Sequence, residues 1–157
     1  MAIPDTPGTN VTVEDLDGSN PIPDGYVLLD VREQDEWDAG HAPGAVHIPM
    51  GELPARMDDI PEGELVVVCR SGGRSARSVA WLNQAGFDAY NLASGMKGWE
   101  SAGLPLTRDD GGAATVVCRP CVAASYRPGV PAIRARTPAA AWADPPRLSA
   151  SAQMKSF

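Results

Sequence analysis

The chain has 157 residues, 43% of them hydrophobic, which is the size of one domain with enough apolar side chains for a core. Residues 1–110 hold nineteen of the twenty acidic side chains but seven of the thirteen basic ones, and so acidic a region argues against a nucleic-acid surface. No stretch is long and apolar enough to span a bilayer, no export signal precedes the first strand, and three cysteines suit reduced thiols, so we expect a cytoplasmic protein.

The N-terminal third predicts an arm followed by two strands. Residues 1–9 are rich in Pro, Gly and Thr and are predicted to be flexible. Residues 11–16 predict a short strand and a helical turn, with Thr12 as N-cap and Asp15 at the capping-box position. Residues 26–30 form an apolar run that is typical of a buried strand.

Two short helices are predicted next, over residues 34–40 and 51–60. Between them, His41 and His47 stand six positions apart on a turn and a short strand. A metal site would need a third ligand, and none is evident in the sequence. We therefore expect structural roles for both histidines and no metal.

The centre of the chain alternates between strand and helix patterns. Residues 65–68 are continuously apolar and β-branched, as in a strand that is covered on both faces. Apolar residues at helical spacing follow over residues 75–85, with Gly86 as the expected cap, and residues 87–92 predict a last strand. This order implies the α/β class, with helices flanking a mainly parallel sheet.

A single cysteine, Cys69, lies between the central strand and the helix after it. Gly72 and Gly73 permit backbone conformations in which successive N–H groups point at one spot, and the helix N-terminus adds its positive end there. Arg70 and Arg74 add formal charge. These surroundings favour a thiolate nucleophile with a pKa below the ordinary value of about 8.5. The alternative is a small buried hydrophobic residue at the end of a strand.

The loop sequence C-R-S-G-G-R-S over residues 69–75 resembles the active-site loop of single-domain rhodaneses, with the pattern C-x-x-G-x-R. Two further motifs agree. Asp30 and Arg32 match the family's D-x-R, and residues 40–49 are similar to its G-H-x-P-G-A-x-x-I-P run. The resemblance covers residues 10–106, although this family more often has glycine where Ser94 stands and alanine where Gly98 stands.

The resemblance implies a three-layer domain over residues 10–110 with a five-stranded sheet. It implies a sulfurtransferase that needs no cofactor and carries sulfur on Cys69 as a persulfide. The donor would be thiosulfate or a related compound, and the acceptor cyanide or a thiol, including thioredoxin or a sulfur-carrier protein. The remaining site residues implied are the loop residues Arg70, Ser71, Gly72, Gly73, Arg74 and Ser75, supported by Asp30 and Arg32.

Two other functions use the same thiol. A cysteine-dependent phosphatase or arsenate reductase would place phosphate or arsenate against the Cys and Arg pair. Such phosphatases have five residues between the two, whereas this chain has four. A non-catalytic sulfide or redox sensor would need only the reactive cysteine.

Residues 111–157 differ in character from the rest. Residues 118–157 contain ten Ala, six Pro and five Arg without helical or strand periodicity, so we predict a disordered tail. Cys118 and Cys121 form a C-x-x-C pair, which suits a redox role or half of a zinc site. Because no second pair exists, we expect neither role to be required.

Overall fold

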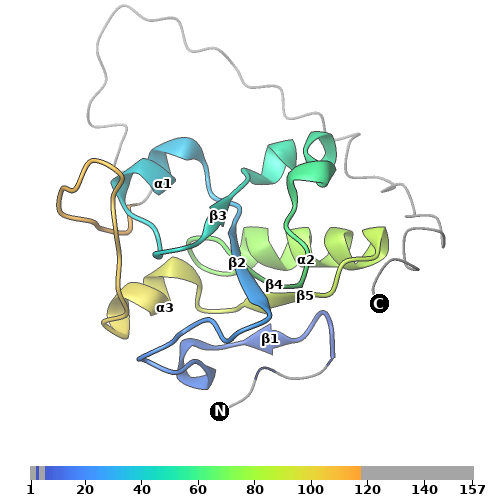
Figure 1. Cartoon of the computed structure of the whole chain (residues 1–157), viewed down its shortest axis with the longest axis horizontal. Helices are drawn as coiled ribbons and strands as arrows, with labels where there is room; N and C mark the ends of the chain where they lie inside the picture. Colours follow the sequence, from blue (N-terminus) through green and yellow to red (C-terminus); the bar gives the residue numbers. More distant parts are fainter. Residues whose placement is uncertain (1–2, 4–5, 118–157) are drawn as a thin grey trace, which may run out of the picture.

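A computed structural model describes residue 3 and residues 6–117 of the chain. Five strands form one sheet in the order β1-β5-β4-β2-β3, and every neighbouring pair is parallel (Figure 1). The strands are β1 (Asn10–Val11), β2 (Tyr26–Asp30), β3 (Val46–His47), β4 (Glu64–Val68) and β5 (Ala89–Leu92). The predicted α/β class and five-stranded sheet are confirmed.

Helices cover both faces of the sheet, which gives the three layers that were expected. Side chains of α2 (Gly73–Ala85) and of the 3-10 helix η2 (Met50–Ala55) pack with Leu29, Leu65 and Val67 on one face. Side chains of α3 (Gly95–Ser101) pack with Leu28, Val66 and Val68 on the other. Successive strand residues point to opposite faces, so a strand covered on both sides must be apolar throughout. This is why β4 reads as an uninterrupted hydrophobic run.

The predicted helices differ from the observed ones in three places. The segment 51–60 forms two 3-10 helices, η2 and η3 (Met57–Asp59), because Pro54 inside η2 has no N–H for a helical hydrogen bond. Helix α2 begins at Gly73 rather than residue 75. Helix α3 was not predicted, since two glycines in seven residues weaken the helical pattern.

The segments that come before β2 and after α3 in the chain also pack against the domain. The 3-10 turn η1 (Val13–Asp15) has the predicted capping box, in which Thr12 N donates to Asp15 Oδ2 over 2.9 Å. Gly8 N donates to Ala89 O over 2.7 Å. The segment after α3, orange in Figure 1, runs back to α1 (Gln34–Ala39), where Thr115 N donates to Ala39 O. Packing thus continues past residue 110.

The C-x-x-C pair at Cys118 and Cys121, like the rest of the predicted tail after residue 117, lies outside the described residues. Over the ranges that are described, no helix is both long and apolar enough to cross a membrane.

Candidate functional site

Cys69 follows β4 at the carboxyl edge of the sheet, and the loop after it turns sharply into α2. Gly72 has φ of +95°, and a Cβ added there would collide with Ala93 O. Only glycine fits this position. Gly73 differs, because its φ is not positive and a Cβ would meet nothing within 4 Å. The expectation that both glycines supply special backbone conformations is therefore wrong for Gly73, which opens the helix.

The N-terminus of α3 holds the loop from the other side. Met96 N donates to Cys69 O over 2.8 Å, and Lys97 N donates to Arg70 O over 3.0 Å. A Cβ on Gly95 would lie 2.6 Å from both carbonyl oxygens. Two backbone carbonyl groups of the loop thus accept hydrogen bonds from N–H groups that the start of a helix leaves without partners. This contact was not predicted from the sequence.

The Cys69 side chain lies within the loop, and the residue is 1% exposed. Gly72 N donates to its Sγ over 3.1 Å, and Ser75 Oγ lies 3.4 Å from the same sulfur. Burial alone raises the pKa of the Cys69 thiol, but hydrogen bonds from Ser75, Ser71 and Gly72 together outweigh it and leave the pKa below the ordinary value. The direction agrees with the reactive thiolate expected from the sequence.

Arg74 faces α1 and not the centre of the loop. Its Nη1 and Nη2 donate to the two carboxylate oxygens of Glu36 over 2.7 and 2.8 Å. Glu36 is fully buried, and burial raises its pKa, but the Arg74 hydrogen bonds, the Glu33 N–H and the nearby Arg32 charge hold the pKa below its usual value. A bidentate pair of this kind fixes direction as well as distance.

Asp30 and Arg32 form a second buried ion pair next to the loop. Asp30 is the last residue of β2. It lies beside Val68, which is the residue before Cys69. Arg32 Nη2 donates to Asp30 Oδ2 over 2.6 Å and to Gly40 O over 2.8 Å. Both side chains are fully buried, so neither charge is in contact with solvent.

Arg70 and Ser71 lie nearer to solvent than the ion pairs. Ser71 is exposed, and Arg70 is half-buried. The Nε atom of Arg70 is buried and has no hydrogen-bond partner among the described residues. A buried donor without an acceptor costs about 1–3 kcal/mol, so this N–H can still donate to an acceptor that the described residues do not supply.

Two residues of the site, Glu36 and Asn91, were not predicted, and Asn91 lies on the other side of the loop. It lies in β5, 5% exposed, and its Oδ1 accepts a 2.6 Å hydrogen bond from Ser75 Oγ. Its Nδ2 donates to Asn10 Oδ1 over 2.8 Å. The available signal was a carboxamide inside an otherwise apolar strand, since buried polar groups need partners.

The two histidines stack on one tryptophan. The Trp37 ring lies 3.6 Å from His41 and 4.7 Å from His47, nearly parallel to both. His41 Nδ1 is 3.0 Å from Trp37 O, and His47 Nε2 is 2.8 Å from Arg32 O. Within the described residues, no three His, Cys, Asp or Glu side chains converge as a metal site would require.

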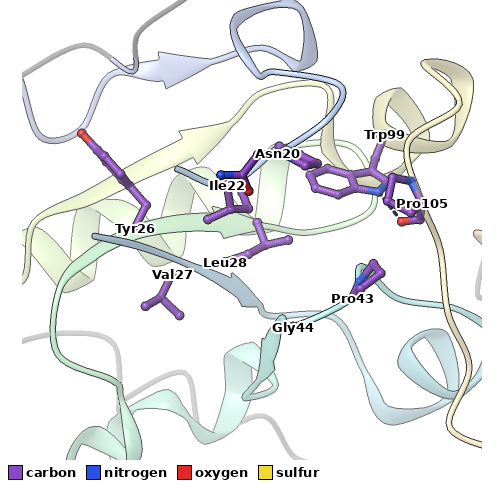
Figure 2. Close-up of a pocket in the computed structure, with 10 residues that line it drawn as sticks. Asn20, Ile22, Tyr26, Val27, Leu28, Pro43, Gly44, Trp99 and Pro105 are labelled. Carbon is purple, nitrogen blue, oxygen red and sulfur yellow. Dashed lines mark hydrogen bonds between the residues drawn. The ribbon is translucent and has the colours of Figure 1, made fainter. Parts of the chain in front are cut away.

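A cavity of about 310 Å³ lies away from the thiol. Its lining is mainly apolar and includes Ile22, Leu28 and Trp99, and none of the lining residues belongs to the 69–75 loop. Figure 2 shows the Trp99 indole beside Pro105, to whose carbonyl oxygen its Nε1 donates over 2.9 Å. The cavity and the 69–75 loop are therefore built from separate residues.

Three comparisons with known proteins point to the same family. A family model described as a rhodanese-like domain matches residues 13–102. The Bacillus subtilis protein YtwF is 42% identical over 79 residues, which are 50% of this chain and 77% of that protein. A sulfurtransferase of Allochromatium vinosum is 38% identical over 87 residues, 54% of this chain and 81% of that protein. The crystal structure of a rhodanese-related protein from Thermoplasma volcanium has a TM-score of 0.57 at 29% identity, covering 63% of this chain and 97% of that chain.

Proposed function

Because this chain belongs to the rhodanese-like family, we propose that it is a sulfurtransferase that moves sulfane sulfur from thiosulfate to a thiophilic acceptor through a Cys69 persulfide. Relatives that are named as sulfurtransferases support the general class of reaction. The observation that carries the proposal is the Gly72 N–H directed at Cys69 Sγ over 3.1 Å at the start of α2. A fixed donor at this point stabilises charge on the sulfur.

In the first half-reaction, the Cys69 thiolate attacks the outer sulfur of thiosulfate. A new S–S bond forms, the bond between the two sulfur atoms of thiosulfate breaks, and its electron pair leaves with sulfite. The products are a singly charged persulfide and a sulfite dianion, so charge is conserved. A persulfide anion retains the charge that the lowered pKa of Cys69 favours.

In the second half-reaction, the acceptor attacks the outer sulfur of the persulfide and the Cys69 thiolate leaves. Cyanide yields thiocyanate in this way, and a thiol yields its own persulfide. The protein returns to its starting state without an external oxidant or reductant. We propose a thiol acceptor in the cell, such as thioredoxin or a sulfur-carrier protein, and a cytoplasmic location.

The two arginines have different proposed roles. Arg70 has a buried Nε without a partner among the described residues, which suits attraction of the dianionic donor. Both terminal nitrogens of Arg74 bind Glu36, which suits bracing of the loop. Asp30 and Arg32 support the same loop from the end of β2.

Neither alternative function gains a specific observation. A phosphatase would need the loop arginine free to bind phosphate, whereas Arg74 binds Glu36 in a bidentate pair. The four residues between Cys69 and Arg74 also form a smaller ring of N–H groups than five would. A sensor would have the same thiol but would not turn over.

Steady-state assays of thiosulfate with cyanide test the proposal. We expect thiocyanate formation over many turnovers, its loss in Cys69→Ser, and most of it to remain when Cys118 and Cys121 are both changed to Ser. Loss of activity in that double variant would show that the pair relays sulfur. Hydrolysis of aryl phosphates faster than sulfur transfer would contradict the proposal, and persulfide formation without turnover would favour a sensor.

A further inference from the structure

The Ser75 hydroxyl lies near three hydrogen-bond acceptors, which is more than it can donate to at once. Its Oγ lies 2.6 Å from Asn91 Oδ1, 3.1 Å from Gly72 O and 3.4 Å from Cys69 Sγ. A hydroxyl has one proton to donate. The short contact with Asn91 takes most of that hydrogen bond, so in this arrangement the sulfur, at 3.4 Å, receives only a weak share of it. A full hydrogen bond from Ser75 to sulfur therefore requires a change at Asn91.

A half-turn of the Asn91 carboxamide supplies that change. The donor and acceptor ends of a carboxamide are nearly equal in size, so the turn exchanges them without altering the shape of the side chain. Nδ2 would then donate to Ser75 Oγ and release the Ser75 proton. Asn91 Oδ1 would accept from the amide of Asn10, which is exposed and therefore able to turn as well.

We propose that Asn91 is a positioning residue for the reaction, whose carboxamide turns over when Cys69 is charged, so that Ser75 donates to the sulfur. The persulfide part rests on the proposed function, and the thiolate part does not. No covalent bond changes in this step. A charged sulfur accepts hydrogen bonds more strongly than a neutral thiol, and this difference drives the turn.

Asn10 offers a way to block the turn from outside the site. Asn10→Asp places a carboxylate at position 10, and a carboxylate only accepts hydrogen bonds. It therefore holds Asn91 Nδ2 towards position 10 and Asn91 Oδ1 towards Ser75. We expect this variant to raise the pKa of Cys69 by about half a unit or more, because charged sulfur loses part of one hydrogen bond. The pKa is measured from the pH dependence of alkylation by iodoacetamide.

Two controls separate the turn from the added charge. Asn10→Ala removes the partner without locking the carboxamide, so the pKa of Cys69 should stay near that of the unmodified protein. Asn10→Asp in a Ser75→Ala background should leave the pKa of that background unchanged, because the effect acts through the Ser75 hydroxyl. Repetition at high salt screens a charge at this exposed position but not a hydrogen-bond lock.

The remaining charged groups stay constant in every variant. The loop, its ion pairs and the start of α3 carry Arg70, Arg74, Lys97, Asp30, Arg32 and Glu36. The elements around them also carry Arg77 on α2, Glu100 on α3, Glu64 on β4, and Asp35 and Asp38 on α1. Thermal unfolding verifies that each variant is folded.

The proposal is overturned if Asn10→Asp does not change the pKa of Cys69, or if the same shift persists in the Ser75→Ala background. Alkylation does not require sulfur transfer, so the two proposals fail separately. A protein that shows the shift but forms no thiocyanate retains Asn91 as a positioning residue for the thiolate and loses the sulfurtransferase assignment. A protein that turns over thiosulfate but shows no shift loses only the role of Asn91.

Discussion

The two sides of the 69–75 loop are built from different chemistry. On the α1 side, the contacts are ion pairs, with Arg74 bound to Glu36 and Arg32 bound to Asp30. On the β5 side, the contacts are neutral hydrogen bonds, and Asn91 links Ser75 to Asn10. The sulfur of Cys69 lies 3.4 Å from the neutral side, at Ser75 Oγ.

This difference suits the two sides to different tasks. Separating a buried ion pair leaves a charge without a partner and costs several kcal/mol, so the α1 side has one stable arrangement. A neutral hydrogen bond contributes about 1 kcal/mol, so the β5 side can exchange donors as the charge on sulfur changes. We infer that the charged side fixes the geometry of the loop and the neutral side tunes the thiol.

The largest effect should come from the backbone contact on the β5 side. Gly72→Ala requires a strained φ and a collision with Ala93 O, so we expect a loss of about 3 kcal/mol or more in unfolding free energy. Sulfur transfer should fall as well, since Gly72 N is a donor to Cys69 Sγ. Urea unfolding and thiocyanate assays measure the two effects.

Gly73→Ala is the matched control. It adds the same atom one residue later, where nothing lies within 4 Å. Because alanine is the better helix former, stability should be unchanged or higher by up to about 1 kcal/mol. Equal losses in both variants would show that the loop does not depend on the Gly72 conformation.

Breaking the α1 side should have the next largest effect. Glu36→Ala leaves the Arg74 guanidinium without its carboxylate, and we expect a loss of about 3 kcal/mol, at the lower end for buried pairs because Arg74 is 27% exposed. Glu36→Gln keeps one acceptor and should lose less. A stable Glu36→Ala protein with full sulfur transfer would contradict the bracing role of Arg74.

For the β5 side we expect a smaller effect, which is a pH dependence of the free energy of unfolding. A thiol whose pKa is lowered on folding adds stability in full above its unfolded pKa, about 8.5, and this contribution is lost as the pH falls through the folded pKa. Because the pKa of Cys69 is lowered, the reduced protein should gain unfolding free energy relative to Cys69→Ser as the pH rises through this window. A pH series of urea unfolding curves measures the gain, and the opposite slope would contradict the lowered pKa.

A more local effect concerns the packing of α3 behind the loop. Ser94 and Gly98 both depart from the pattern that the family resemblance led us to expect, and a Cβ on Gly98 would collide with the Ser94 side chain. We expect Gly98→Ala to cost about 1–2 kcal/mol. Ser94→Gly in the same chain should recover most of that loss, which a double-mutant cycle measures. Additive losses would show that the two positions are independent.

The apolar pattern predicted the sheet well because burial on both faces leaves a local signature. Strand β2 has the predicted bounds, and β4 differs by one residue. Helix α3 escaped prediction, since what fixes it is long-range: Met96 N and Lys97 N bind carbonyls of the loop. The cysteine, the loop glycine at position 72 and the D-x-R pair were visible as motifs, and the structure brings them together.

The partners of those residues were not visible in the sequence. Glu36 is one of many acidic residues, and it lies 38 positions before Arg74 in the chain. Only the fold brings the two side chains into bidentate contact. Asn91 similarly meets Ser75 from a neighbouring element. Pairings of this kind depend on where parallel strands end, which no local pattern specifies.

The central claim is that Cys69 carries the transferred sulfur. Intact-protein mass spectrometry after incubation with thiosulfate tests it directly, with peptide mapping to locate the modification. The account predicts a gain of one sulfur atom at Cys69, its removal by cyanide or a thiol, and no gain in Cys69→Ser. An unmodified protein, or sulfur carried at Cys118 or Cys121 in place of Cys69, would contradict it.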